Sequence, residues 1–308
     1  MYNAHSMNDY IGEHYLMSSS IRQDACKGCK LCIEVCPTNI IGVDEDGHTS
    51  FIVGREHICL KCGQCMAVCT TDAIQIEGIS YDDNLFKIPK NSVNYENYTD
   101  LLASRRSVRN FKQKEVSQEV LQEILDSIDF APYGASPNDV HITVINNRET
   151  IESALPHIEK FLDDIPKWMK NPIISFFIKR KVGIETFNTI KYHLTPISET
   201  GNYKLENGDR ITRDAPALII FHAEVGAQEH SHNALIYATY AMLATHALGL
   251  GATINGIVPA AVNKVQEVKD IFQIPKNHEA VISIMLGYPK YKYKKTIQRK
   301  KTNINWLT

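Results

Sequence analysis

The pattern of apolar and polar positions predicts a mixture of helices and strands over most of the chain. Residues 117–130 carry apolar side chains at helical spacing, which predicts an amphipathic helix. Three apolar runs have the length expected of buried strands, at residues 141–145, 215–221 and 280–286. Residues 232–250 are rich in Ala and apolar almost all round, which predicts a long helix at the centre of a domain or at an interface.

The same pattern divides the chain into parts. Residues 1–20 are a polar N-terminal extension, and a cysteine-rich segment occupies residues 21–80. Residues 81–97 contain turn formers and no steady period, which predicts a linker. A second domain, residues 98–308, is expected to begin with a helix that starts near Asp100.

Length and composition agree with this division. A chain of 308 residues fits two domains better than one, and 44% hydrophobic residues suffice for a sizeable core. A net charge of -2 gives no indication of a nucleic-acid partner. Residues 1–20 lack the apolar stretch of a signal peptide, and no run is long enough to span a membrane. We therefore expect a cytoplasmic protein, whose reduced thiols bind metal more often than they form disulfides.

All the cysteines lie in two copies of one spacing, x2-x2-x3, which repeat at an interval of 33 residues. The first copy holds Cys26, Cys29, Cys32 and Cys36, and the second holds Cys59, Cys62, Cys65 and Cys69. Similarity continues beyond the cysteines, so the segment is an internal duplication.

This spacing is typical of two [4Fe–4S] clusters. Three thiolates at two-residue gaps can bind three irons of one cubane, and the last Cys of each run binds the other cluster. We therefore assign Cys69 to the cluster of the first run and Cys36 to that of the second. Gly28 and Gly63, inside the loops, would let backbone amides approach the sulfurs.

Other uses of the cysteines fit less well. Structural zinc sites usually have two Cys pairs with a longer spacer, a disulfide framework requires a secreted chain, and a redox dithiol requires one isolated Cys-x-x-Cys. The segment resembles the bacterial two-cluster ferredoxins over residues 21–80. Its one departure is Thr70, where a proline commonly follows the last Cys.

Candidate binding residues in the second part begin with a basic cluster. Arg105, Ser107 and Arg109 alternate, so an extended backbone would project all three to one side, where they suit a phosphate. An exposed basic helix end is the alternative. Further along lie a loop of turn formers at residues 131–138, a Gly-Leu-Gly run at 249–251 and a cationic tail at 290–301. The glycine run ends a helix, so it is not a dinucleotide fingerprint.

Taken in order, these motifs resemble the nitroreductase family of FMN-dependent oxidoreductases, over residues 98–308. With the cysteine-rich segment, the chain resembles the ferredoxin–nitroreductase fusion proteins. The resemblance implies an α+β fold, a homodimer and FMN at the subunit interface. It assigns FMN contacts to twelve residues: Arg105, Ser107, Arg109, Pro132, Tyr133, Ser136, Asn138, Gly249, Gly251, Ala252, Arg299 and Lys300.

Three features remain open. Family members usually have Asn and Gln where this chain has Ser136 and Asn138, so the polar contacts to the flavin ring differ here. The aromatic-rich region 151–213 is either core or a lid over the substrate. Twelve histidines, including His222, His230 and His232, are potential metal ligands, but no carboxylate arrangement in the sequence supports a site.

The function that follows is an FMN-dependent reductase in which two [4Fe–4S] clusters pass electrons to the flavin, for reduction of a nitroaromatic, quinone or enone. External ferredoxin or NAD(P)H would supply the electrons. Catalytic residues are not identified, although Tyr133 and His141 are candidates for the proton donor. Two alternatives stay open: an electron-transfer or redox-sensing module without its own substrate, and a reductive dehalogenase or oxidase of the same family.

Overall fold

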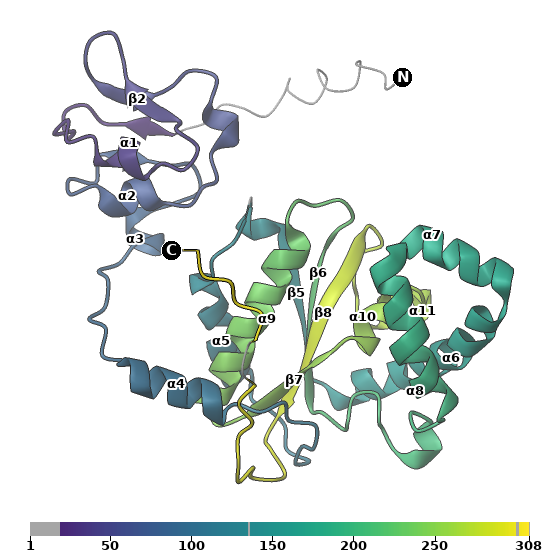
Figure 1. Ribbon diagram of the computed structural model, residues 1–308. Helices are drawn as coiled ribbons and strands as arrows, with labels where there is room; N and C mark the ends of the chain where they lie inside the picture. The colour runs from purple at the N-terminus through teal and green to yellow at the C-terminus, as the bar shows by residue number, and fades with distance from the viewer. Residues whose placement is uncertain (1–18, 135, 300–301, 308) are drawn as a thin grey trace. The chain divides into compact units, whose positions relative to one another are not determined.

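The computed structural model describes residues 19–134, 136–299 and 302–307 (Figure 1). These residues divide into two compact units, and the division lies between Ser92 and Val93. Each unit has its own hydrophobic core. No helix in the described ranges has both the length and the apolar character that a membrane span requires.

The N-terminal unit is built from two small antiparallel sheets and two short helices. Strand β1 (Ser20–Ile21) pairs with β4 (Ile74–Gln75), and β2 (Ile41–Val43) pairs with β3 (Thr49–Phe51). Helices α1 (Leu31–Val35) and α2 (Gln64–Val68) pack on each other, and η1 (Glu56–Ile58) precedes the second cysteine run. The buried residues of this core are Cys32, Ile40, Ile41, Cys65, Met66, Ile74 and Ile76.

The backbone of this unit keeps the sequence duplication. Left-handed backbone angles occur at equivalent places in the two copies: at Gly28 and Lys61, at Lys30 and Gly63, and at Asn39 and Asp72. Two of the six positions are therefore the glycines expected in the loops, and their counterparts are lysines. The turn geometry, more than the residue type, is what the duplication has retained.

The expected linker contains helical turns at both ends. Helix α3 (Tyr81–Asn84) begins where the Ser80 hydroxyl accepts the N–H of Asp82, and Tyr81 and Leu85 pack against the N-terminal core. Helix α4 (Tyr95–Ser104) begins earlier than the expected start near Asp100, because the Asn94 side chain caps it by accepting the N–H of Asn97 at 2.8 Å.

The C-terminal unit is organised around a four-stranded antiparallel sheet in the order β5-β6-β8-β7 (Figure 1). The strands are β5 (Val140–Ile145), β6 (Ala217–Glu224), β7 (Gly251–Asn255) and β8 (His278–Gly287). Three of them correspond to the predicted apolar runs. One end of the sheet holds the start of β6, the end of β8 and the start of β7, and the other holds the start of β5 and the end of β6.

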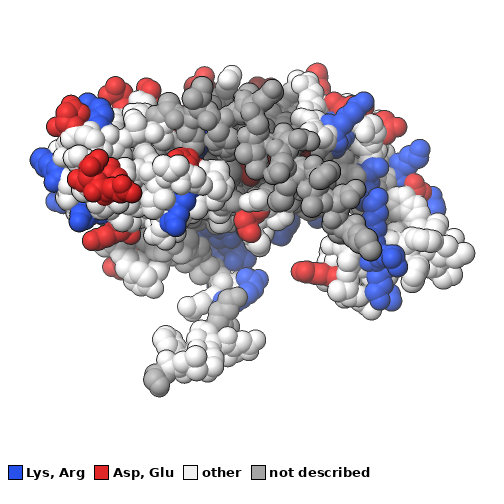
Figure 2. Space-filling model, turned by 90° about the horizontal axis from the view of Figure 1, so that it is seen from above, with Lys and Arg blue, Asp and Glu red and all other residues white. Residues whose placement is uncertain are grey.

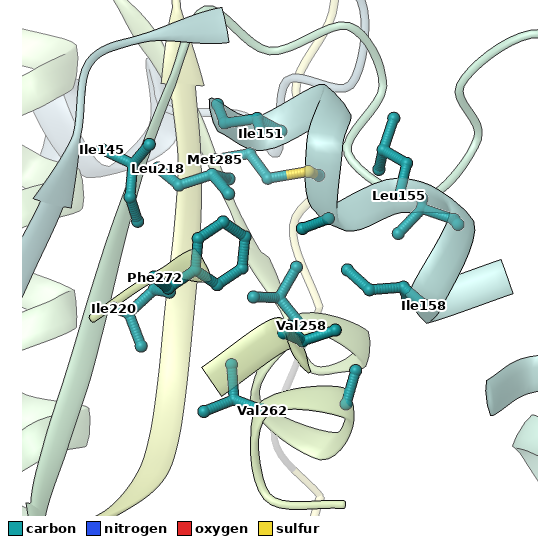
Figure 3. Close-up of a cluster of buried hydrophobic side chains, with 14 of the residues drawn as sticks. Ile145, Ile151, Leu155, Ile158, Leu218, Ile220, Val258, Val262, Phe272 and Met285 are labelled. Carbon is teal, nitrogen blue, oxygen red and sulfur yellow. The ribbon is translucent and has the colours of Figure 1, made fainter. Parts of the chain in front are cut away.

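Helices cover both faces of this sheet. Helix α5 (Gln118–Asp126), η2 (Ser127–Phe130) and the long α9 (His230–Ala247) cover one face, and α6 (Arg148–Lys170), α10 (Ile257–Val262) and α11 (Gln266–Ile271) cover the other. Alternate residues of β6 enter the two cores, so Phe221 faces α9 while Leu218 and Ile220 face α10 and Phe272 (Figure 3). This burial on both faces explains why the β6 sequence is continuously apolar.

The region 151–213 is helical and divides its aromatic residues between core and surface. Helix α6 is followed by α7 (Pro172–Thr189), a π-helical turn η4 (Ile190–Leu194), α8 (Thr195–Glu199) and η5 (Leu205–Asn207). Phe187 and Tyr203 are buried, whereas Phe176, Phe177 and Tyr192 are each 61% exposed. Basic side chains gather over these helices (Figure 2). The region is therefore partly core, with an apolar and basic outer surface on α7.

Candidate cofactor sites

The N-terminal unit contains a cavity lined by four cysteines from both copies of the repeat. Cys26, Cys29 and Cys32 come from the first run, and Cys69 comes from the end of the second. Apolar residues close its inner side, Ile21 and Ile74 among them. The lining cysteines are the four that the spacing assigns to one cluster.

A second cavity has the reciprocal composition. It is lined by Cys59, Cys62 and Cys65 of the second run and by Cys36 of the first. Cys62 and Cys29 are the exposed members of their cavities, and Cys65 and Cys32 are the buried ones. Burial raises the pKa of the Cys65 thiol to about 11, so the free thiol is protonated at neutral pH. Because a metal binds the thiolate, metal binding would release this proton.

Backbone amides point at the two crossing cysteines in the same way. The N–H of Ile40 donates to Sγ of Cys36 at 3.4 Å, and the N–H of Ala73 donates to Sγ of Cys69 at 3.3 Å. Burial alone would raise the pKa of both thiols, but these and neighbouring donors outweigh it and lower the pKa of each. Such N–H···S contacts stabilise a thiolate ligand and affect a cluster's reduction potential.

In the C-terminal unit, the basic segment after α4 lies along the edge strand β7. Ser107 forms a parallel bridge with Ala252, and the N–H of Val108 donates to the carbonyl of Ala252 at 3.1 Å. The backbone at Arg105 has left the helix for an extended conformation. The segment is therefore extended beside a strand. This is the conformation in which Arg105, Ser107 and Arg109 would project to one side.

The glycines after α9 have separate roles. Gly249 has a positive φ of 78° and ends the helix, and its N–H donates to the His246 carbonyl at 3.0 Å. Gly251 begins β7, and a β-carbon there would lie 2.3 Å from Cγ2 of Val108. The absence of a side chain at Gly251 is what lets the Arg105–Arg109 segment lie against the sheet.

The loop that contains Pro132, Tyr133, Ser136 and Asn138 is held by α9. The buried Asn233 side chain accepts the N–H of Gly134 at 2.8 Å and donates to its carbonyl at 2.9 Å. The Ser136 hydroxyl accepts the N–H of Asn138 at the start of η3 (Pro137–Asp139). Asn233 was not among the residues predicted from the sequence.

This loop and the basic segment lie at opposite ends of α9. Asn233 is near the start of the helix, whereas His246, near its end, is 2.8 Å from the Ser104 hydroxyl. At a rise of about 1.5 Å per residue, the two contacts are about 20 Å apart along the helix axis. Within one chain, therefore, Arg105–Arg109, Gly251 and Ala252 come together, and the loop 132–138 is separate from them.

The C-terminal tail returns to the basic segment. The Thr296 hydroxyl donates to the Ala103 carbonyl at 2.6 Å, and the Arg106 guanidinium lies 5.9 Å from the centre of the Tyr293 ring. Arg299, three residues beyond Thr296, is exposed. Lys300 lies outside the described residues.

A second group of arginines, not predicted from the sequence, faces the basic segment. The carboxylate of Asp209 holds the loop before β6: it accepts the N–H of Thr212 at 2.7 Å and binds the Arg148 guanidinium at 2.9 Å. In this loop Arg213 has a positive φ of 60°. Burial, followed by the charges of Arg210 and Arg109, lowers the pKa of Arg213. Arg109 and Arg213 are close because the segments that follow them meet at the end of β8. Phe111, after Arg109, and Pro216, after Arg213, both contact the position of Gly287.

The charge of this region fits an anionic ligand. Arg109 and Arg210 lie close enough to Arg213 for their charges to act on it. Among the described residues, these three guanidiniums and those of Arg105 and Arg106 form no ion pair with a carboxylate. Nε of Arg106 is buried without a hydrogen-bond partner. Unpaired guanidiniums repel one another, and a phosphate would relieve that repulsion with bidentate hydrogen bonds.

Comparison with known proteins follows the same division of the chain. Residues 25–73 match the model of a 4Fe-4S dicluster domain, and residues 102–288 match that of the Nitroreductase family. A relative in Methanothermobacter thermautotrophicus, named "Putative NADH dehydrogenase/NAD(P)H nitroreductase", is 22% identical over 194 residues, which cover 62% of this chain and 76% of the relative.

Two solved structures show the fold of the C-terminal unit. A nitroreductase with bound FMN from Desulfitobacterium hafniense is 19% identical with a TM-score of 0.50, and the match covers 68% of this chain and 97% of that one. A nitroreductase with bound FMN from Bacteroides fragilis has the same identity and TM-score, with coverage of 70% and 100%. The α+β fold is therefore confirmed as a ferredoxin-like domain followed by a nitroreductase domain. The chain belongs to the nitroreductase family of oxidoreductases and carries an N-terminal 4Fe-4S dicluster domain.

Proposed function

We propose that this protein is an FMN-dependent reductase in which two [4Fe–4S] clusters pass electrons to FMN, for two-electron reduction of a small organic substrate of the nitroaromatic, quinone or enone type. The observation that carries the proposal is the basic segment beside Gly251 and β7, whose arginines form no ion pair with any described carboxylate. This anion site occurs in a chain whose other unit has two four-cysteine cavities.

The residues that would hold the FMN phosphate and ribityl chain are Arg105, Ser107 and Arg109, with Arg299 and Lys300 from the tail. Arg213 would add a cation beside Arg109, where it can balance negative charge on the ligand. Gly251 and Ala252 would let the ligand approach the backbone of β7. When bound, FMN accepts electrons singly and can deliver two to an organic substrate.

A homodimer would complete the site. Pro132, Tyr133, Ser136 and Asn138 lie about 20 Å along α9 from the basic segment of their own chain, so a second copy is the means by which both sets would contact one ligand. The resemblance to the nitroreductase family implies this homodimer, and two structures that share the fold hold bound FMN. Tyr133, in the loop 132–138, is the candidate proton donor. His141 lies with His222 and His278 on the opposite face of the sheet, so we do not assign that role to it.

The electron donor is proposed to be external ferredoxin or NAD(P)H, with transfer through the clusters preferred. The chain would hold the clusters with Cys26, Cys29, Cys32 and Cys69 on one side and Cys59, Cys62, Cys65 and Cys36 on the other. Among the described residues there is no domain with a dinucleotide fingerprint, since the Gly249–Gly251 run ends a helix. A cytoplasmic location follows from the need to keep these thiols reduced.

The test begins with anaerobic purification and measurement of iron and released FMN per chain. The reduced protein is then mixed with a nitroaromatic, a quinone and an enone, and flavin re-oxidation is followed by absorbance. We expect about eight irons, one FMN and re-oxidation by at least one substrate. Arg109→Ala should release FMN and leave the iron content unchanged.

Each of the other outcomes rejects a part of the proposal. Absence of extractable FMN would reject the reductase and leave the cluster domain in place. FMN without re-oxidation by any of the substrates would favour the electron-transfer module. Release of halide from a halogenated aromatic, or loading of the clusters by an oxidisable substrate, would favour the dehalogenase or the oxidase.

A further inference from the structure

Three histidines from three adjacent strands meet on the α11 face of the sheet, at the end away from the basic segment. His141 on β5 pairs in register with His222 on β6, and His278 begins β8. The His141 ring lies 5.7 Å from the His222 ring and 4.7 Å from the His278 ring, centre to centre. His222 and His278 are buried, and His141 is exposed.

The two buried rings face each other through nitrogen. Nδ1 of His222 lies 2.9 Å from Nδ1 of His278. Two nitrogens on one tetrahedral zinc ion, each at about 2.0–2.1 Å, would lie about 3.3 Å apart. The Nδ1–Nδ1 distance therefore has to lengthen by only about 0.4 Å for both nitrogens to bind one ion.

The second nitrogen of the His222 ring, Nε2, has a hydrogen-bond partner of its own. This nitrogen lies 3.0 Å from the Thr143 hydroxyl. When Nε2–H donates to that hydroxyl, the Nδ1 lone pair is directed at His278. Metal-binding histidines characteristically have such a partner on the second nitrogen, because it fixes the tautomer and the ring orientation.

The surrounding charges are one anion and one cation. Glu224, which pairs with His278 in the strand register, affects His278 as a negative charge, and Lys269 from α11 affects both buried rings as a positive charge. The Lys269 ammonium is engaged by the carbonyls of Lys276 and His278, at 2.9 and 2.5 Å.

We propose that His141, His222 and His278 form a binding site for a divalent transition-metal ion of the zinc class, separate from the iron–sulfur and flavin sites. His222 and His278 are the two preset ligands. His141, exposed at the strand start, turns its side chain inward to become the third and leaves a path for the ion to enter. A fourth position goes to water or to the Glu224 carboxylate.

Among the described residues, the three histidines do not each offer a ring nitrogen within 4.8 Å of the other two, so His141 has to move to complete the site, and a different group does meet that distance. Asp44, Asp46 and His48 bring three ligand atoms within 4.8 Å of one another. That group is an exposed turn whose geometry is explained by its own hydrogen bonds, since Asp44 accepts the N–H groups of Asp46 and His48. The histidine site instead rests on buried rings from three separate strands.

The test is equilibrium dialysis of the untagged, cluster-loaded protein against micromolar Zn²⁺ under anaerobic conditions, with zinc and iron measured in the same sample. We expect one zinc per chain and unchanged iron. His141→Ala should weaken binding about tenfold or more, and Thr143→Val should weaken it about 10–100-fold. His222→Ala should abolish it.

His232→Ala is the matched control, because this histidine is exposed and pairs with Glu229, the residue that precedes its helix. It should bind zinc as the wild type does. Absence of zinc from wild-type protein with full iron would show that the Nδ1–Nδ1 contact is only a hydrogen bond between neutral rings. Equal binding by the His141→Ala, His222→Ala and control proteins would place the zinc elsewhere. Either result would overturn the proposal, and because His141 is exposed, its variant tests the site even where His222→Ala fails to fold.

Discussion

Gly251 and Val108 are in direct backbone-to-side-chain contact: a β-carbon on Gly251 would lie 2.3 Å from Cγ2 and 2.7 Å from Cβ of Val108. Val108 cannot move away from Gly251 easily, because its side chain is buried and its N–H donates to the Ala252 carbonyl. The proposed phosphate-binding residues Arg105, Ser107 and Arg109 are part of the segment that this contact positions.

Gly251→Ala should therefore displace the basic segment from β7. We expect a loss of more than half of the bound FMN and a cost of about 1–3 kcal/mol in the free energy of unfolding, as for other overpacked sites. FMN per chain and urea unfolding measure the two effects.

Gly256→Ala is the control for this substitution. A β-carbon at Gly256 meets nothing within 4 Å, and its φ of -94° suits any residue. The Gly256→Ala protein should have the FMN content and the free energy of unfolding of the wild type. Equal losses from both alanines would contradict the role given to the Gly251–Val108 contact.

Asp209 should stabilise the Arg213 loop in a pH-dependent way. Its side chain is 5% exposed, and although burial pulls its pKa upward, hydrogen bonds from Thr212 and Arg148 prevail and lower the pKa below its ordinary value near 3.8. A depressed carboxyl pKa contributes stability above the unfolded-state pKa, and this contribution is lost as pH falls through the folded-state pKa.

Asp209→Asn should cost about 1.5–3 kcal/mol at pH 7, the range for hydrogen bonds to a charged group. The difference in the free energy of unfolding between this variant and the wild type should be constant between about pH 5 and 8. It should become smaller below about pH 4. Urea unfolding followed by tryptophan fluorescence measures it, since Trp168 packs against the core of this unit and Trp306 is 81% exposed. Asp214→Asn is the control, because that carboxylate is 56% exposed. A difference that stays unchanged down to pH 3 would argue against the ionised Asp209.

The sequence predicted local features well because local chemistry determines them. Ser117 before a helical apolar period marks the start of α5, where its hydroxyl accepts the N–H of Val120. The continuous apolar run of β6 and the cysteine spacing are equally local. The alternation of Arg105, Ser107 and Arg109 indicated an anion site, and the structure places this segment beside β7.

Asn233 and Arg213 were missed for the opposite reason. Asn233 holds Gly134 across 99 residues of sequence, and Arg213 is positioned through Asp209 and Arg148, 61 residues apart. Both look like ordinary polar residues in their own segments. Only the packing of α9 and of the sheet end brings each of them to its partner.

The crossing of cysteines between the two runs predicts a specific pattern of iron loss. Cys26→Ala with Cys29→Ala should leave about four of about eight irons, because one cluster is lost. Adding Cys69→Ala should remove no more iron, since Cys69 lines the cavity of the cluster already lost.

Adding Cys36→Ala to the same double variant should remove iron from the remaining cluster, whose cavity Cys36 lines. Iron analysis and the electron paramagnetic resonance of the reduced protein follow both steps. The reverse pattern, with further loss from Cys69→Ala and none from Cys36→Ala, would mean that each run binds its own cluster.

The separation of the two half-sites along α9 predicts complementation between damaged chains. Arg109→Ala removes a residue of the basic segment, and Asn138→Ala removes one from the loop held by Asn233. If each flavin site combines the segment of one chain with the loop of another, a mixed dimer has one intact site and one doubly damaged site. If each site lies within one chain, both sites of the mixed dimer are damaged.

Co-expression with two different affinity tags and sequential purification would isolate the mixed dimer. We expect it to hold about half of the wild-type FMN, whereas each single variant alone holds little. A chain that sediments as a monomer, or a mixed dimer with no more FMN than its parents, would contradict the shared site. The iron content should be the same in every preparation, because neither residue lines a cluster cavity.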